Sequence, residues 1–206
     1  MFNMPNEKII EAYSSGRCPI CTLLRQDEFD YLCNWVSISN EKYKNSRMRQ
    51  GLLKSNGFCN YHFWEFSKIS NNYGSAGICV GLIEKIINNL QDQKDFLGVK
   101  CPVCIDLKVN ESKYIKELVF SLSSPENKTR YAEGWGLCIP HLSKTMAYTK
   151  DASLISYLLE TEKLQLERVK MNALELIRKE GPPLRWEQTD DEKKSWFRAI
   201  EKLVGR

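Results

Sequence analysis

The stretch CPIC at residues 18–21 and its near copy CPVC at residues 101–104 decide how the chain is organised. Each copy is followed by a second element of matching type, GFCNYH at residues 57–62 and GLCIPH at residues 136–141. Because the two elements return in the same order, the sequence predicts two copies of one unit. These four stretches hold both histidines of the protein and six of its eight cysteines.

Each repeat offers three cysteines and one histidine, which is a donor set of tetrahedral zinc. Two residues separate the donors within each element, so a short arc of backbone can present both of them to one ion. The predicted metal ligands are Cys18, Cys21, Cys59 and His62 in the first repeat, and Cys101, Cys104, Cys138 and His141 in the second. We expect one Cys3His site in each repeat, although the spacing also permits the repeats to exchange their CxxH elements.

The segments around these elements carry the apolar spacing of helices, with steps of three and four residues. Pro19 and Pro102 suit the first turn of a helix, where the missing N–H is not needed. We expect helices over residues 18–36, 41–54, 75–97, 101–122, 138–149 and 153–179. No strand alternation is evident, so the sequence predicts an all-α protein. Its expected parts are residues 1–98, residues 99–181, and a C-terminal arm, 182–206, that packs on these units or on a partner.

Composition limits the protein class. The chain has 206 residues, of which 42% are hydrophobic and 27% charged, so it is expected to be globular and not disordered. The longest apolar run, Gly77–Ile83, is far too short to cross a bilayer. Residues 1–11 lack the pattern of a secretory signal, so we expect a cytoplasmic protein without membrane association. In a reducing compartment, patterned cysteines favour metal or redox sites over structural disulfides.

The predicted metal role is structural. A site closed by four protein ligands leaves no open position for hydrolytic water. The H-x-E element of zinc deaminases is absent, because Trp64 and Ser143 stand two residues after the histidines. The sequence also lacks a glycine-rich phosphate loop and a nucleophile elbow, so we expect no enzyme. A thioredoxin-like use of CPxC would need a strand before the helix, and none is predicted.

The sequence therefore predicts a non-catalytic protein with two zinc ions that serves as a scaffold for a protein partner. The alternative is an iron–sulfur protein with two [4Fe-4S] clusters, acting in electron transfer or redox sensing, because ligand type alone does not separate the two. Nucleic acid is not an expected partner. The net charge is only +4, and the basic residues between 42 and 54 are interpreted as a solvated helix face.

These elements resemble those of a family of uncharacterised prokaryotic proteins, which carry duplicated CPxC and GFCxxH elements on a helical chain. The ending of this chain, around Trp186 and Ser195–Leu203, is similar to the ending of that family. Leu137 stands where the second unit of the family has phenylalanine. The resemblance supports the eight ligands and implies no activity.

Overall fold

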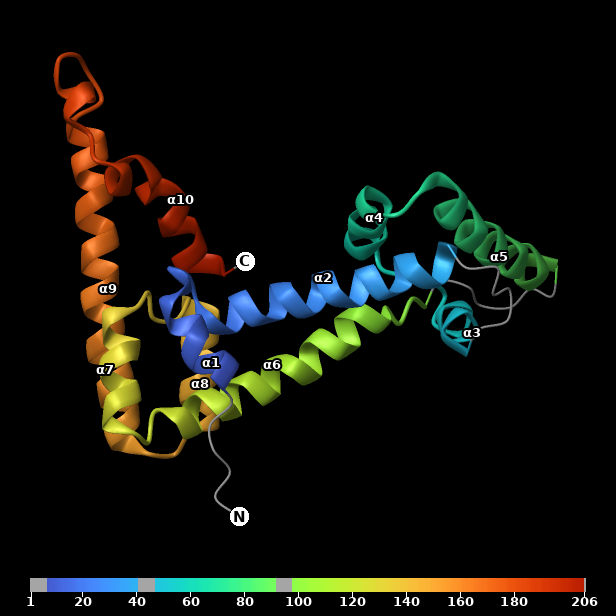
Figure 1. Ribbon diagram of the computed structural model, residues 1–206, viewed down its shortest axis with the longest axis horizontal. Coiled ribbons are helices and arrows are strands. Elements are labelled where there is room, and N and C mark those ends of the chain that lie inside the picture. The colour runs from blue at the N-terminus through green and yellow to red at the C-terminus, as the bar shows by residue number, and fades with distance from the viewer. Residues whose placement is uncertain (1–6, 41–46, 92–97, 206) are drawn as a thin grey trace. The chain divides into compact units, whose positions relative to one another are not determined.

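The structure is a computed structural model that describes residues 7–40, 47–91 and 98–205 (Figure 1). Across these ranges the chain forms helices and no strand, which confirms the all-α prediction. In chain order the helices are α1 (Glu7–Glu11), the 3-10 helix η1 (Ala12–Ser15), α2 (Pro19–Asn40), α3 (Arg47–Lys54), α4 (Asn60–Ile69), α5 (Asn72–Gln91), α6 (Pro102–Ser121), α7 (Pro125–Glu133), α8 (Ile139–Tyr148), α9 (Ala152–Arg178), the 3-10 helix η2 (Leu184–Glu187) and α10 (Asp190–Val204).

The four repeated elements all mark the start of a helix. The two long helices α2 and α6 begin at Pro19 and Pro102, as the sequence predicts. Cys59 and Cys138 are the N-cap residues of α4 and α8. Each CxxH element therefore places its cysteine at a helix N-terminus and its histidine in the first turn. The partial positive charge at this end of a helix favours thiolate, the metal-binding form of cysteine.

The predicted boundaries differ from the observed ones mainly in the first repeat. The sequence predicts Ser75 as the N-cap of this helix, but α5 begins at Asn72, so Ser75 lies inside it. Residues 41–46 and 92–97 of two predicted helices lie outside the described residues. Helices α1, α4, α7 and α10 were not among the predicted helices.

The chain packs as two compact units whose boundaries cut through the long helices. Unit 1 contains residues 1–25 and 111–206, and unit 2 contains residues 26–110. Helix α2 therefore begins in unit 1 and ends in unit 2, whereas α6 begins in unit 2 and ends in unit 1. Neither unit corresponds to one sequence repeat.

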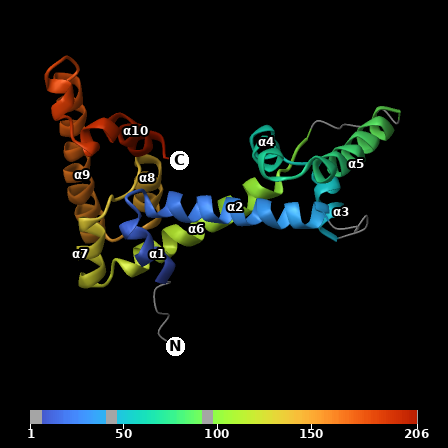
Figure 2. The same cartoon turned by 45° about the horizontal axis from the view of Figure 1, so that its top comes forward.

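Unit 1 gathers α1, α7, α8, α9 and α10 with the start of α2 and the end of α6 (Figure 2). Its core is apolar and aromatic, and it includes Ile9, Ile20, Leu118, Tyr131, Leu137 and Leu158. Helix α10 packs against α9 and α8. A capping box between Thr189 and Glu192 begins α10, and the buried side of this helix is polar. The C-terminal arm of the sequence is thus an ordered helix of unit 1.

Unit 2 holds α3, α4 and α5 with the end of α2 and the start of α6. Its core includes Leu32, Trp35, Leu52, Phe58, Phe66, Ile78, Leu82 and Val103. Phe58 lies at the centre of this core, with edge-on contacts to Trp35 and to Phe63 of α4. This aromatic packing fixes residue 58, and with it the ligand Cys59 that follows.

Candidate metal centres

In unit 1, the first CPxC element meets the second CxxH element. The donor atoms of Cys18, Cys21, Cys138 and His141 all lie within 4.8 Å of one another, and we call this group site 1. The three sulfur atoms surround Nδ1 of His141, at 3.4 Å for Cys18, 3.3 Å for Cys21 and 3.1 Å for Cys138. All four side chains are buried.

Unit 2 repeats this arrangement with the remaining elements. Site 2 consists of Cys59, His62, Cys101 and Cys104, again with all four donor atoms within 4.8 Å of one another. Nδ1 of His62 lies 3.2 Å from the sulfur of Cys59, 3.4 Å from that of Cys101 and 3.3 Å from that of Cys104. The eight predicted ligands thus come together as two groups of the expected composition.

The expected grouping within each repeat is wrong, and the repeats exchange their CxxH elements. The positions of the glutamates that contact the histidines show the separation. Glu28 contacts His62 and follows Cys18 by ten residues, which is roughly 15 Å along α2 at about 1.5 Å per residue. Cys59 and His62 therefore lie too far along this helix to join Cys18 and Cys21. Glu111, which contacts His141, follows Cys101 along α6 in the same way.

The distances within each group suit a single ion. Four ligands around one tetrahedral zinc place their sulfur atoms about 3.8 Å apart, and place nitrogen and sulfur about 3.5 Å apart. The sulfur atoms of Cys21 and Cys138 are 3.7 Å apart, as are those of Cys59 and Cys104. None of the eight cysteines forms a disulfide. Each group could therefore hold a metal ion with little movement of its donors.

A half-buried carboxylate contacts each histidine, and neither carboxylate was predicted from the sequence. Nε2 of His141 lies 2.9 Å from Glu111, and Nε2 of His62 lies 3.2 Å from Glu28. A carboxylate on the second ring nitrogen leaves Nδ1 to bind a metal and makes it more basic. A sequence signal exists, because each glutamate follows the first cysteine of its CPxC element by ten residues. Each long helix thus gives two cysteines to one site and a glutamate to the other.

The metal-ligand candidates of site 1 differ in the direction in which their pKa values are shifted. Burial disfavours the imidazolium of His141, but hydrogen bonds with Cys138 and Cys21 outweigh it and raise its pKa to about 10. Hydrogen bonds with Cys18 and Cys21 hold the pKa of Cys138 well below its usual range. Burial raises the pKa of Cys18 well above its ordinary value.

In site 2, too, the pKa of one cysteine is lowered and that of another is raised. Burial opposes ionisation of Cys101, but the hydrogen bond with His62 lowers its pKa to about 6. Burial and the hydrogen bond with Cys59 raise the pKa of Cys104 to about 12. Hydrogen bonds with Cys101, Glu28 and Cys59 overcome burial and raise the pKa of His62 to about 10. Thiolate and imidazolium thus lie side by side, and a bound cation would displace the remaining protons.

The other two cysteines lie outside both sites. The apolar residues around Cys33 and Cys79 in the sequence predict that both are core residues. This prediction is wrong, because both are half-buried and neither belongs to the core of unit 2. Cys79, Leu82, Ile83, Ile86 and Leu90 recur at steps of three and four residues, which predicts a buried apolar stripe on α5. This prediction is largely wrong, because only Leu82 of these residues is buried. Gly74, Ile78 and Leu82 form its buried side, whereas Ile83 and Leu90 are exposed.

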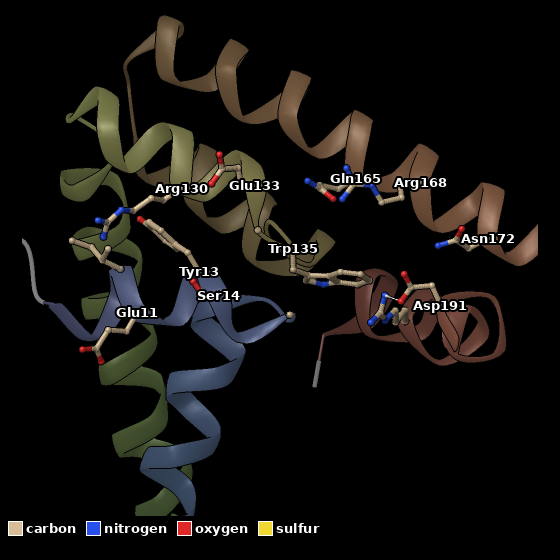
Figure 3. A pocket seen from close by; sticks show the side chains of 14 residues that line it. Glu11, Tyr13, Ser14, Arg130, Glu133, Trp135, Gln165, Arg168, Asn172 and Asp191 are labelled. Carbon is tan, nitrogen blue, oxygen red and sulfur yellow. Dashed lines mark hydrogen bonds and ion pairs between the residues drawn. The ribbon is translucent and has the colours of Figure 1, made fainter. Parts of the chain in front are cut away.

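A pocket of about 680 Å³ lies in unit 1, lined by residues of α1, η1, α7, α9 and α10 and of the segment before α8 (Figure 3). Its charged side chains are three arginines and three acids, so its lining carries no net charge. Arg198 pairs with Asp191 at 2.9 Å and stacks on the ring of Trp135. The lining contains no cysteine or histidine, so it offers no nucleophile with a histidine base.

Comparison with known proteins yields one informative relative. The chain is similar to a protein of Caldicellulosiruptor sp. (strain Rt8B.4) described as an "Uncharacterized 23.9 kDa protein in xynA 3'region". The two are 25% identical over 210 residues, which cover 96% of this chain and 99% of the relative. No family model matches the chain, and no solved structure matches it significantly. The relative agrees with a resemblance to uncharacterised proteins, and its description assigns no activity.

Proposed function

We propose that the protein is a non-catalytic metal protein whose two Cys3His sites each hold one structural zinc ion. The observation that carries this is the convergence of four donor atoms within 4.8 Å in each unit. The glutamates behind His62 and His141 support it, since they orient Nδ1 toward the sulfur atoms. In this role, each ion joins the starts of two helices that are distant in sequence.

The compactness of the sites favours zinc over the iron–sulfur alternative. In a [4Fe-4S] cluster each protein ligand binds a different iron, so the cluster itself holds the ligand atoms apart. The sulfur pairs at 3.7 Å leave room for one ion only. Zn²⁺ binds mixed sets of thiolate and imidazole ligands, and its charge stays +2 because it has no redox chemistry.

Elemental analysis of anaerobically purified protein tests the metal assignment. We expect two zinc ions per chain and a colourless sample. A brown sample with iron and acid-labile sulfide would overturn the zinc proposal in favour of clusters, and one iron per site without sulfide would overturn it in favour of mononuclear iron. A metal-free protein that binds no zinc on reconstitution would refute metal binding altogether.

Exposed apolar side chains support the proposed role as a scaffold for a protein partner in the cytoplasm. Helix α5 presents Val80, Ile83, Ile87 and Leu90 to solvent at steps of three and four residues. Helix α10 also exposes a large apolar side chain, that of Trp196. No helix in the described ranges is both long and apolar enough to cross a membrane.

The partner is tested by changing the stripe of α5 and leaving the metal sites intact. We expect the double variant Ile83→Ser/Ile87→Ser to keep its metal content and to lose a protein that co-purifies with the wild type. Asn88→Ser, at an exposed polar position of the same helix, is the matched control. A partner retained equally by all three proteins would contradict this surface as its binding site.

A further inference from the structure

The two metal sites differ sharply in their access to solvent. In site 1 the exposed fraction is 0% for Cys138 and at most 8% for the other three ligands. In site 2, His62 and Cys101 are buried, Cys59 is half-buried and Cys104 is exposed. Ligands that are equivalent in the repeat, such as Cys21 and Cys104, thus have different surroundings.

The end of α10 covers site 1. Gly205 packs so closely that a β-carbon there would lie 3.1 Å from the sulfur of Cys138 and 3.4 Å from that of Cys21. Lys202, which is fully buried, donates to the carbonyl oxygen of Leu137 at 2.7 Å and pairs with Glu162. This polar anchor holds α10 over the segment that carries Cys138.

Within the described residues, the first repeat has no helix that corresponds to α10. After the second CxxH element the chain continues through α8, α9 and α10. After the first CxxH element it continues through α4 and α5, and only residues 92–100 separate α5 from Cys101. The aromatic side chains near His62 do not close site 2 either, because Tyr61 and Trp64 are 58% and 67% exposed.

We propose that site 2 is a metal-exchange site, which gives up and takes up its zinc ion through Cys104, whereas site 1 releases its ion much more slowly. This inference rests on the proposed function of both sites as zinc sites. The exchanging ligand is a soft donor, a thiol of a small molecule or of another protein. An incoming thiol can reach the ion on the side of Cys104 without unfolding the unit.

The exchange step balances without an oxidant. The zinc–sulfur bond to Cys104 breaks as a zinc–sulfur bond to the incoming thiol forms, and the proton of that thiol passes to the sulfur of Cys104. The ion remains Zn²⁺ and no electron is transferred. The same step at site 1 would first require the end of α10 to leave Cys138 and Cys21, because Gly205 occupies the approach.

The test follows zinc transfer from the full-length, two-zinc protein to a chromophoric chelator at neutral pH. We expect one equivalent per chain to leave about tenfold faster than the other or more, because the shell around a site controls solvent access. Cys104→Ser should abolish the fast equivalent and keep the slow one. Its repeat counterpart, Cys21→Ser, should keep the fast equivalent. Two equivalents released at one rate would overturn the inference, as would loss of the slow equivalent in Cys104→Ser.

A second measurement on the wild-type protein guards against variants that fail to fold. The zinc-loaded chain is treated briefly with an alkylating reagent, and the labelled cysteines are mapped by mass spectrometry. Among the six ligand cysteines, we expect Cys104 to be labelled first and Cys18 and Cys138 last. Equal labelling of both sites would count against exchange at site 2. A protein that binds no zinc would instead refute the proposed function, so the two failures are distinguishable.

Discussion

The buried ion pair between Lys202 and Glu162 gives a prediction whose size follows from the contacts. Lys202 is 1% exposed and Glu162 is 2% exposed. Nζ of Lys202 lies 2.5 Å from one carboxylate oxygen of Glu162. The other oxygen accepts hydrogen bonds from the hydroxyl of Tyr131 and from the backbone N–H of Leu137. Each of these polar groups has a hydrogen-bond partner. One member of the cluster, Leu137, directly precedes Cys138 in the chain.

Replacing Lys202 by methionine keeps the length of the side chain and removes its charge. The carboxylate of Glu162 then remains buried without its cation, which costs about 3–5 kcal/mol. The carbonyl oxygen of Leu137 also loses its donor. We expect Lys202→Met to destabilise unit 1 by this amount and to loosen the cover over site 1. The double variant Glu162→Gln/Lys202→Met should recover most of the loss, because it removes the charge and keeps an acceptor for Tyr131.

Chemical denaturation followed by far-UV circular dichroism measures this effect on zinc-loaded, full-length protein. Lys194→Met is the matched control, since Lys194 is exposed on the same helix, and its effect should stay within about 0.5 kcal/mol. A midpoint for Lys202→Met equal to that of Lys194→Met would refute the reasoning. So would a double variant less stable than Lys202→Met alone, because the cost would then not come from an unpaired charge.

Four further predictions follow from the sites. Removing zinc with a strong chelator should abolish much of the helicity seen by circular dichroism, because a structural zinc contributes about 10–16 kcal/mol in small peptides; unchanged spectra after verified metal loss would argue against a structural role. Glu111→Ala should weaken zinc binding at site 1, and Glu28→Ala at site 2, by about 10- to 100-fold in chelator competition, and no change in either would show that these carboxylates do not support the ligands. Gly136→Ala should cost about 1–3 kcal/mol in denaturation, since φ is +72° and a β-carbon would overlap a buried carboxylate, whereas Gly181→Ala, where nothing lies within 4 Å, should be tolerated; equal effects would contradict this. Residues 1–98 alone should bind no zinc ion at wild-type affinity, because they contain half of each site, and one tightly bound ion per fragment would favour grouping within the repeat.

The candidate ligands and the helix starts could be predicted from sequence because both depend on local chemistry. A proline at the first helical position and two donors separated by two residues act over a single turn. The grouping of the ligands depends on where a long helix delivers the chain, which the spacing between Cys21 and Cys59 does not reveal. The roles of Glu28 and Glu111 were hidden for the same reason, since each contacts the histidine of its own repeat, which belongs to a different site from the cysteines next to that glutamate in the sequence.

The buried faces of α5 and α9 were harder to predict, because periodicity shows which residues share a face and not which face is covered. In α9 the buried side includes Thr161, Glu162 and Gln165, whereas Leu159 and Ile177 are exposed. Glu162 is buried because Tyr131, Leu137 and Lys202 satisfy its carboxylate. A pattern based on hydrophobicity assigns such a residue to the surface.

Because the repeats exchange their CxxH elements, neither repeat contains a complete Cys3His group by itself. Helix α2 holds Cys18 and Cys21 of site 1 and Glu28 behind His62 of site 2, while α6 holds the corresponding residues in reverse. The duplication thus yields two sites, each of which takes its supporting residues from both repeats.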